Sequence, residues 1–134
     1  SPAERQWIKN NQSRIILAIE TNYPPFVFLD SNNRVSGLAQ DYVSLIEKKL
    51  GVHFRQRQFS SLDSILGNAR AGKVQIVNAV TATPHRLEFL EFTNPYISVP
   101  NVIIVRKDHF GSINNKNLAG RKVSMVRGYA VAEC

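Results

Sequence analysis

The sequence predicts an α/β domain built around a largely parallel β-sheet. Apolar, β-branched runs of strand length occur at residues 14–20 and 74–80, and unbroken runs of this kind are typical of strands buried on both faces. Between them, apolar residues recur at helical spacing from Leu38 to Leu50. Because strands and helices alternate, each helix returns the chain to the start of a further parallel strand. The 134 residues are sufficient to bury one core.

We expect helices at residues 3–10, 38–50, 62–71 and from residue 84 onward, and those at 38–50 and 62–71 carry apolar residues at helical spacing. Trp7 and Ile8 are the apolar anchors of the first helix. Gly51 ends the second helix, because glycine adopts the left-handed conformation after a helix at little cost. Ser60 or Ser61 supplies the side-chain cap of the third helix. Thr83 caps the fourth helix, and Pro84 occupies its first position, where a missing N–H costs nothing.

The predicted strands have β-branched or alternating apolar residues, and we expect them at residues 14–20, 26–29, 53–59, 74–80, 89–92, 97–107 and 121–126. After the first strand, Pro24 and Pro25 impose an extended turn, because neither can donate to a strand ladder or continue a helix. Residues 30–33 are of types that tolerate positive φ. We therefore expect the strand at 26–29 to turn there and return through Val35 as a hairpin.

The order of these elements predicts two lobes of unequal completeness. Residues 1–12 form a leader helix, and residues 13–107 form the first lobe. Residues 108–117 are a loop, after which a strand and a helix beginning at Gly128 open a new unit. Since a parallel strand is not stable without neighbours, residues 108–134 are interpreted as the start of an incomplete second lobe. Its apolar strand edges favour a dimer or a swap with another copy.

The composition excludes several classes of protein. The net charge is +7, but no run of basic residues is longer than two, whereas phosphate binding usually needs a clustered basic patch. We therefore expect no nucleic-acid partner. No apolar stretch is long enough to span a bilayer, and the first twelve residues lack the apolar segment of a signal peptide.

Signatures of metal binding and catalysis are sparse. His53, His85 and His109 are scattered, without acids or cysteines at metal-ligand spacing. Cys134 is the single cysteine and the last residue, which excludes an internal disulfide and a positioned nucleophile. There is no glycine-rich phosphate motif. We expect no metal, no cofactor and no enzymatic activity.

Candidate ligand-binding residues follow the carboxyl ends of the predicted strands, where open parallel sheets bind their ligands. Glu20 ends the first strand; it either contacts a cation or is a solvated strand end, and the second interpretation is favoured. Tyr23 either stacks on a ligand or fills the core beneath the two prolines. Tyr129 follows the strand at 121–126 in the second lobe.

The strand at 74–80 leads to three further candidates, Thr81, Ala82 and Arg86. A helix N-terminus offers unpaired N–H groups, and Arg86 in the first turn adds a planar fork suited to a carboxylate. An arginine in a first turn is unfavourable for the helix dipole unless an anion lies nearby. Two interpretations stay open, a bound anion and a salt bridge to Glu88 or Glu91.

Five segments together resemble the family 3 bacterial extracellular solute-binding proteins. They are RIILAIETNYPPF, GLAQDYVSLIEKKLGV, VQIVNAVTATPHR, FTNPYISVPNVIIVRKD and LAGRKVSMVRGYA. Their order and spacing cover residues 13 to 131. The resemblance implies a periplasmic-binding-protein-like type II fold, in which two α/β lobes joined by crossing strands close on a small ligand. The chain would then hold lobe 1, with its mostly parallel sheet, and the beginning of lobe 2.

The resemblance also implies roles for individual residues. By position, Arg86 and Thr81 would hold a ligand carboxylate, and Tyr23 would pack over the ligand. Residues 97–107 would cross toward the second lobe. Transport members of the family usually present Thr or Ser where this chain has Tyr129, which removes one hydroxyl donor.

The leader helix with its tryptophan resembles periplasmic sensor modules of membrane histidine kinases and diguanylate cyclases. We therefore expect a periplasmic sensor domain that recognises an amino-acid-like or carboxylate solute, signals by lobe closure and belongs to a membrane-anchored protein. One alternative is a transport-associated periplasmic amino-acid-binding protein. The other is a cyclohexadienyl dehydratase-like enzyme, for which Glu20 is the candidate acid or base.

Overall fold

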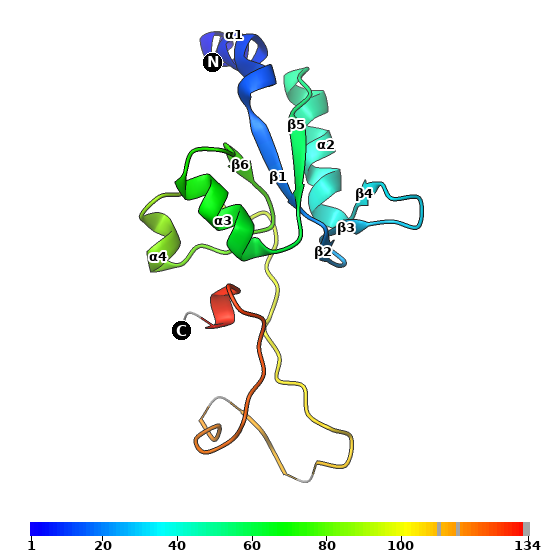
Figure 1. Cartoon of the computed structure of the whole chain (residues 1–134), viewed down its shortest axis with the longest axis vertical. Coiled ribbons are helices and arrows are strands. Elements are labelled where there is room, and N and C mark those ends of the chain that lie inside the picture. The colour runs from blue at the N-terminus through cyan, green and yellow to red at the C-terminus, as the bar shows by residue number, and fades with distance from the viewer. Residues whose placement is uncertain (110, 115, 133–134) are drawn as a thin grey trace. The chain divides into compact units, whose positions relative to one another are not determined.

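The structure is a computed structural model that describes residues 1–109, 111–114 and 116–132. The chain divides into two compact units, Ser1–Glu91 and Phe92–Cys134. The first unit runs from the blue N-terminus to the green segments of Figure 1, and it contains every strand of the described residues. Each unit is described by itself. The lobe boundary expected at residue 107 stays a prediction.

The centre of the first unit is a parallel three-stranded sheet in the order β5-β1-β6. Its strands are β1 (Ile16–Glu20), β5 (Arg55–Phe59) and β6 (Ile76–Val77). In register, Ala18 of β1 lies opposite Arg57 on one side and opposite Val77 on the other. The parallel sheet predicted from the alternation of elements is confirmed.

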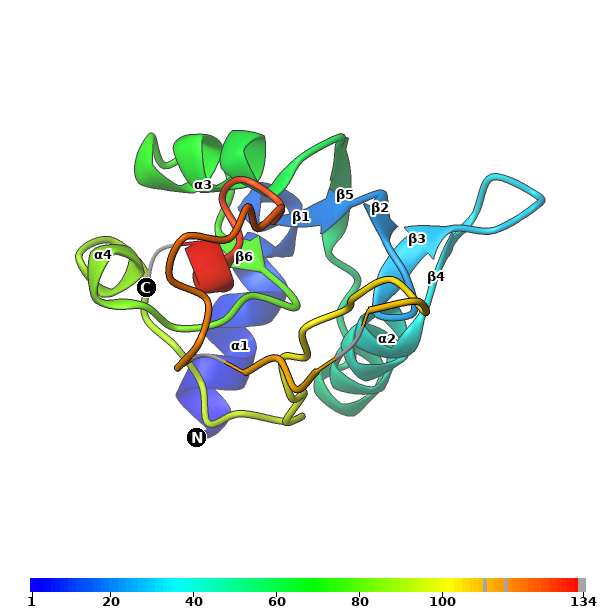
Figure 2. The ribbon, with the colours of Figure 1, turned by 90° about the horizontal axis from the view of Figure 1, so that it is seen from below.

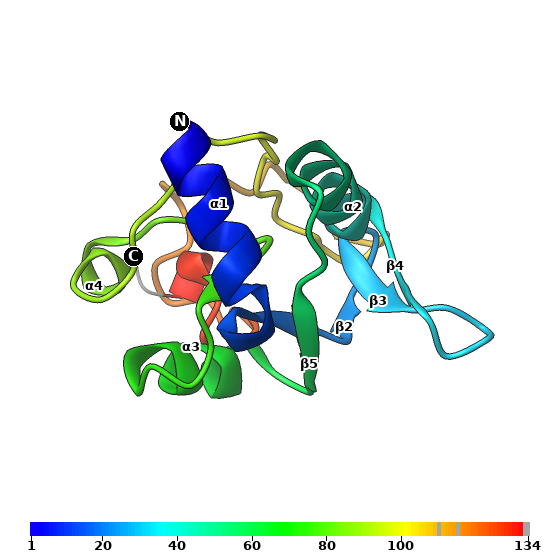
Figure 3. The ribbon, with the colours of Figure 1, turned by 90° about the horizontal axis from the view of Figure 1, so that it is seen from above.

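Helices α2 (Leu38–Leu50) and α3 (Leu62–Arg70) connect these strands. Because β5 and β6 flank β1, the two connections run in opposite directions, and right-handed crossovers then place their helices on opposite faces. Figures 2 and 3 show this arrangement, with α2 on one side of β1 and α3 on the other. The predicted caps are confirmed: Gly51 is left-handed after α2, and the Ser61 side chain accepts from the Ser64 N–H.

The core lies mainly between β1 and α2. Its buried residues come from β1 and the residue before it, from the hairpin between β1 and α2, from the inner face of α2 and from the segment before β5: Ile15, Leu17, Ile19, Val27, Ala39, Val43, Val52 and Phe54. On α2 the buried positions recur every four residues and end at Glu47. The Glu47 carboxylate accepts a hydrogen bond from the Phe54 N–H at 2.7 Å. A buried acid on α2 therefore binds the backbone of the residue that directly precedes β5.

A small antiparallel sheet leads from β1 into α2. It consists of β2 (Asn22–Tyr23), β3 (Val27–Leu29) and β4 (Val35–Ser36), which confirms the predicted hairpin. In its turn, Asp30 Oδ1 accepts from the N–H groups of Asn32 and Arg34, at 2.8 and 2.9 Å. The hydrogen bond from the Arg34 N–H lowers the pKa of the Asp30 carboxyl.

The chain starts with α1 (Pro2–Asn11) and a short 3-10 turn, η1 (Gln12–Arg14). The Ser1 side chain accepts from the Glu4 N–H, and the Glu4 carboxylate bonds back to the Ser1 amino group, so that both ends of this capping arrangement are satisfied. The predicted leader helix is confirmed. Trp7 on this helix is 61% exposed.

Four predicted strands are wrong in length or in existence. The strand expected at 74–80 is reduced to the two residues of β6, because Ala79 has a φ of 52° and turns the chain out of the sheet. Residues 89–92, 97–107 and 121–126 form no strand. An extended segment becomes a strand only when a neighbour satisfies its backbone groups.

The helix expected after Gly128 is also shorter than predicted. The described residues of the second unit contain a single 3-10 turn, η2 (Ala130–Ala132). In this unit Val102 and Ile104 are 75% and 89% exposed. The apolar residues on which the strand predictions depended are therefore not packed in a sheet.

Candidate functional site

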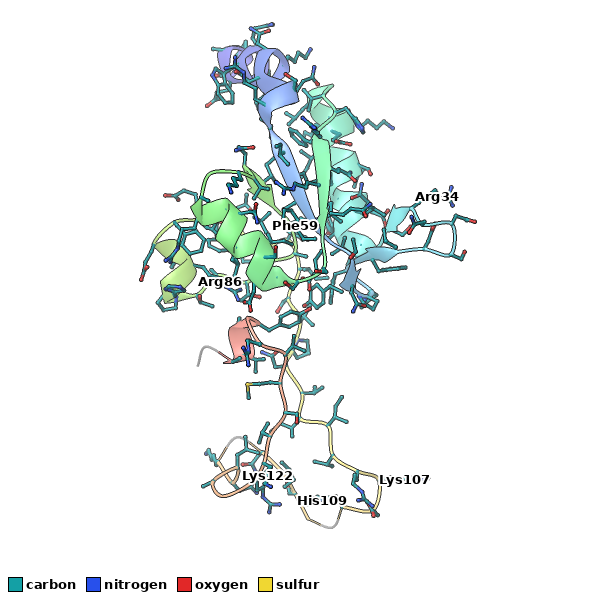
Figure 4. The ribbon with its side chains drawn as sticks, viewed as in Figure 1. Arg34, Phe59, Arg86, Lys107, His109 and Lys122 are labelled. Carbon is teal, nitrogen blue, oxygen red and sulfur yellow. The ribbon has the colours of Figure 1, made fainter. Side chains whose placement is uncertain are left out.

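The candidate site lies at the carboxyl edge of the parallel sheet. Because β1, β5 and β6 are parallel, their C-terminal residues meet at one edge, and Phe59, labelled in Figure 4, ends β5 there. At this edge the Thr21 N–H and hydroxyl both donate to the Phe59 carbonyl oxygen, at 3.0 and 3.2 Å. The segment after β6 leads from the same edge into α4 (Pro84–Leu87).

Local sequence determines the start of α4. Thr83 has an extended backbone and its hydroxyl oxygen accepts from the Arg86 N–H at 3.4 Å, while Pro84 takes the first helical position. Both predictions for this helix start are confirmed. The helix has only four residues, so its dipole is far weaker than that of a long helix, and the predicted anion site at its N-terminus depends on side chains instead.

Arg86 is the main charged side chain of this segment. It is 1% exposed and ranks first by volume among the fully buried side chains. Its Nη1 donates to the Thr81 carbonyl oxygen at 2.9 Å. Burying a guanidinium is costly unless its N–H groups are hydrogen-bonded and its charge is balanced. The burial of Arg86 and its hydrogen bond to Thr81 therefore hold the guanidinium in a fixed position in the lobe.

The structure bears on the second interpretation of Arg86, a salt bridge to Glu88 or Glu91. The Glu88 carboxylate lies 3.6 Å from Arg70 Nη2 and 3.5 Å from His85 Nδ1. The Glu88 carboxylate is therefore engaged by Arg70 of α3 and by His85 of α4. Glu91 is exposed.

Thr81 and Ala82 are both exposed and lie between β6 and α4. Thr81 contributes its backbone carbonyl to Arg86. The contact of its hydroxyl with a carboxylate, and the contact of Ala82 with a ligand, stay predictions.

Two neighbouring residues were missed by the sequence reasoning. The side-chain Nδ2 of Asn78 is buried and has no hydrogen-bond partner among the described residues. Ala79 holds a positive φ, which is uncommon for a residue other than glycine. An asparagine directly after a buried apolar strand was the one available signal, and nothing in the sequence marks the backbone of Ala79.

Glu20 differs from its favoured interpretation as a solvated strand end. It is the last residue of β1 and is only 8% exposed. The prediction was wrong because exposure depends on what packs around the end of the strand, and the run of apolar residues before Glu20 does not report that. A contact with a solute cation stays a prediction.

Tyr23 is half-buried and packs against the core, with its ring centroid 5.0 Å from that of Phe26. Core packing is therefore part of its role, and a contact with a ligand stays a prediction. Tyr129 belongs to the second unit, where its carbonyl oxygen accepts from the Ala132 N–H at 2.8 Å. Its contact with a ligand also stays a prediction.

The described residues contain no group of three or more His, Cys, Asp or Glu side chains placed to hold a metal ion. Over the same ranges, no helix has the length and apolar character required to cross a bilayer.

A parallel-sheet domain whose loops meet at the carboxyl edge of the sheet has the architecture of a class of ligand-binding domains. The chain belongs to the bacterial extracellular solute-binding proteins, family 3, which it matches over residues 15–127. The family resemblance inferred from the sequence is confirmed. The domain is therefore a solute-binding domain of the periplasm, as predicted.

Curated relatives include sensors and transport proteins. The virulence sensor protein BvgS of Bordetella pertussis is 24% identical over 130 residues, which span 97% of this chain and 10% of BvgS. A probable amino-acid ABC transporter-binding protein of Haemophilus influenzae is 29% identical over 110 residues, which span 81% of this chain and 42% of the relative. The chain thus spans less than half the length of either protein.

Solved structures share the fold. An ancestral arginine-binding protein bound to arginine is 31% identical, with a TM-score of 0.57 over 62% of this chain and 37% of the other. The periplasmic VFT2 domain of Bordetella pertussis BvgS is 21% identical, with a TM-score of 0.64 over 72% and 41%. An ancestral cyclohexadienyl dehydratase is 23% identical, with a TM-score of 0.58 over 69% and 38%. The type II fold predicted from the sequence is confirmed.

Proposed function

We propose that this domain binds a small amino-acid-like or carboxylate solute at the loop between β6 and α4, with Arg86 as the residue that holds the carboxylate. The observation that carries the proposal is a buried arginine at the carboxyl edge of a parallel sheet, in a chain of a solute-binding family. A guanidinium presents two parallel N–H donors that match a carboxylate, and such pairs are about twice as strong as neutral hydrogen bonds.

Binding at Arg86 requires a local rearrangement. The guanidinium is 1% exposed, and its Nη1 is already hydrogen-bonded to the Thr81 carbonyl. A solute carboxylate would accept from the guanidinium in a state where the segment between β6 and α4 has moved. Thr81 and Ala82 are exposed in that segment and Asn78 has a buried donor, so these residues are the proposed further contacts.

Glu20 is the proposed partner for a positively charged group of the solute. It ends β1 at the same edge of the sheet from which the Arg86 segment starts. A zwitterionic solute carries one anionic and one cationic group, and complementary charges at one edge would orient it. Tyr23 would then pack against its apolar part.

In the whole protein we propose a sensor role, in which closure of two lobes on the solute is transmitted to a membrane-anchored output region. The alignment with BvgS covers 97% of this chain and so includes most of the leader helix, whereas the family match begins at residue 15. The ligand shifts the population toward the closed state only because it binds that state more tightly. The transport alternative rests on the transporter-binding relative.

The dehydratase alternative has less support. The neighbour of that kind is similar at the level of fold, at 23% identity. Glu20 remains its candidate acid or base. Incubation of the protein with prephenate or arogenate distinguishes the two functions, and we expect no turnover.

The proposal is tested by titrating the ¹⁵N-labelled protein with L-arginine, L-glutamine, L-glutamate and succinate while amide shifts are recorded. We expect at least one solute to shift amides of residues 78–87. Arg86→Lys keeps the charge but lacks the planar fork, so it should weaken binding about tenfold. Arg34→Ala, which removes an exposed cation of the hairpin, is the control and should bind as the unchanged protein does.

Unchanged affinity in both Arg86→Lys and Arg86→Ala would show that the carboxylate is held elsewhere. Circular dichroism of each variant separates loss of the site from loss of the fold. The same titration on a chain extended through the second lobe should give tighter binding. A solute that is contacted from two sides has more of its apolar surface removed from water.

A further inference from the structure

The end of α3 and the turn after α4 are joined by one arginine. The guanidinium carbon of Arg70 lies 4.5 Å from the centroid of the Phe89 ring. Arg70 Nη2 lies 3.6 Å from Glu88 Oε2 and 3.3 Å from His85 Nε2. The His85 and Phe89 rings meet edge to face, with centroids 6.1 Å apart. We call these four residues the Arg70 cluster.

Helix α4 buries no apolar side chain. It is a single turn of four residues, and so short a helix is unstable by itself in water. Arg86 is its only buried residue, and Leu87 is 58% exposed. Because α4 buries no apolar side chain, its attachment to the lobe depends on polar and ring contacts. The Arg70 cluster supplies such contacts from a helix of nine residues.

The position of α4 determines the position of Arg86. The Arg86 N–H is bonded to Thr83 at the helix start, and the Arg86 carbonyl oxygen accepts from the N–H groups of Phe89 and Leu90, at 3.2 and 2.9 Å. Arg86 is thus connected by its backbone to the turn that carries Phe89. A shift of the Phe89 ring relative to α3 is transmitted to the backbone of Arg86.

We propose that Arg70 is a positioning residue for the solute site, which fastens α4 to α3 and so holds Arg86 where a carboxylate can meet it. The inference rests on the proposed function, because it takes the solute to bind at Arg86. Arg70 does not itself contact the solute. Arg70 changes the affinity for the solute by raising the fraction of molecules in which α4 is docked against α3.

The planar guanidinium is the part of Arg70 that matters. It lies over a ring face and simultaneously pairs with a carboxylate, which a lysine ammonium does less well. The side chains of Arg70 and Glu88 are 53% and 64% exposed, so water and salt weaken the pair. We therefore expect an effect of about fivefold on docking of α4, as for an exposed cation–ring contact.

Hydrogen exchange tests the docking directly, without any solute. In Arg70→Ala the amides of Arg86, Leu87 and Phe89 should exchange about fivefold faster, while those of β1 keep their rates. Arg70→Lys retains a cation at the C-terminus of α3, so the interaction of this charge with the helix dipole is kept. Faster exchange in that variant would therefore be due to the loss of the guanidinium. Phe89→Leu removes the ring that Arg70 contacts and should speed the exchange of the α4 amides to a similar extent.

The chain offers a matched control. Arg57 of β5 also lies over a phenylalanine ring, with its guanidinium carbon 5.1 Å from the centroid of Phe59, but β5 is at the opposite edge of the sheet from β6, the strand that leads into α4. Arg57→Ala should leave exchange of the α4 amides unchanged. Equal rates in Arg70→Ala, Phe89→Leu and Arg57→Ala would overturn the proposal.

Solute titration then separates this proposal from the proposed function. With L-arginine and L-glutamine as probes, Arg70→Ala should weaken binding about fivefold, and Arg70→Lys should be intermediate. Faster α4 exchange with unchanged affinity would overturn the positioning role. If Arg86→Lys also left affinity unchanged while α4 exchange responded to Arg70, the proposed binding site itself would be wrong and the docking of α4 by Arg70 would stand.

Discussion

The two units of this chain each contain a short apolar segment, and the two segments have different structures. Residues 16–19 and residues 102–105 are both apolar, yet the first lie in the central strand β1 and the second form no strand. In β1 every residue pairs with β5, Leu17 and Ala18 also pair with β6, and four of the five residues are buried. The difference shows that strand propensity becomes strand structure only when neighbouring strands and a covering helix are present.

The largest effect is expected from core truncation in the first unit. Leu17 of β1 is fully buried, so Leu17→Ala should lower the free energy of unfolding by about 2–5 kcal/mol. Ile104→Ala, in the second unit, removes a side chain that is 89% exposed and should change stability by less than about 0.5 kcal/mol. Urea unfolding of both variants makes the measurement. Equal losses would mean that the second unit is packed in solution.

Two glycines with nearly the same φ sharpen the comparison. Gly37 has a φ of 113° and an added Cβ would lie 2.5 Å from the Phe26 carbonyl oxygen, whereas Gly111 has a φ of 108° and open space around it. Gly37→Ala should destabilise the protein by about 2–3 kcal/mol, from strain and overlap together. Gly111→Ala should have a much smaller effect on thermal unfolding, because an added Cβ there has open space around it. A similar loss in both would make strain alone responsible.

A third prediction concerns the acid between α2 and β5. Glu47 is buried and accepts from the Phe54 N–H, so Glu47→Ala leaves that donor unsatisfied at a cost of about 1–2 kcal/mol. Glu47→Gln keeps an acceptor oxygen and should cost less. Asp41→Ala, an exposed acid of the same helix, serves as the control in guanidinium unfolding. The argument is refuted if Asp41→Ala is as destabilising as Glu47→Ala.

The smallest effect is expected from pH at the hairpin. The pKa of Asp30 lies below its ordinary value of 3.8, chiefly because its carboxylate accepts from the Arg34 N–H. A carboxyl with a depressed folded pKa adds stability that is present above the unfolded value and is lost as pH falls through the folded value. Asp30→Asn should therefore reduce the loss of stability on acidification below about pH 4. Thermal melts between pH 2 and pH 6, as an approximate range, compare the two proteins.

Features set by local chemistry could be predicted from the sequence. The caps at Ser61 and Thr83 and the left-handed Gly51 follow from the side chain or backbone of one residue, and all three were predicted. The alternation of elements was enough for the parallel sheet, because helical connections make adjacent strands parallel.

Features set by the surroundings could not be predicted. Glu20 was expected in solvent and is buried, and Ala79 turns the chain after two residues of β6. The strand predictions for residues 97–107 and 121–126 were wrong, because an apolar sequence pattern does not show whether neighbouring strands are present. At the candidate site, Arg86 was found from its place after a strand, but its burial and the contacts of Arg70 required coordinates.

Trp7 has a consequence for spectroscopy. It is the one tryptophan of the chain, and it lies largely exposed on the leader helix. The intrinsic indole fluorescence of this protein therefore reports on α1 alone. A solute bound at the Arg86 loop leaves that emission unchanged unless the leader responds to binding. A shift in emission maximum on adding solute would thus be an optical signal that occupancy of the site is transmitted to the start of the domain.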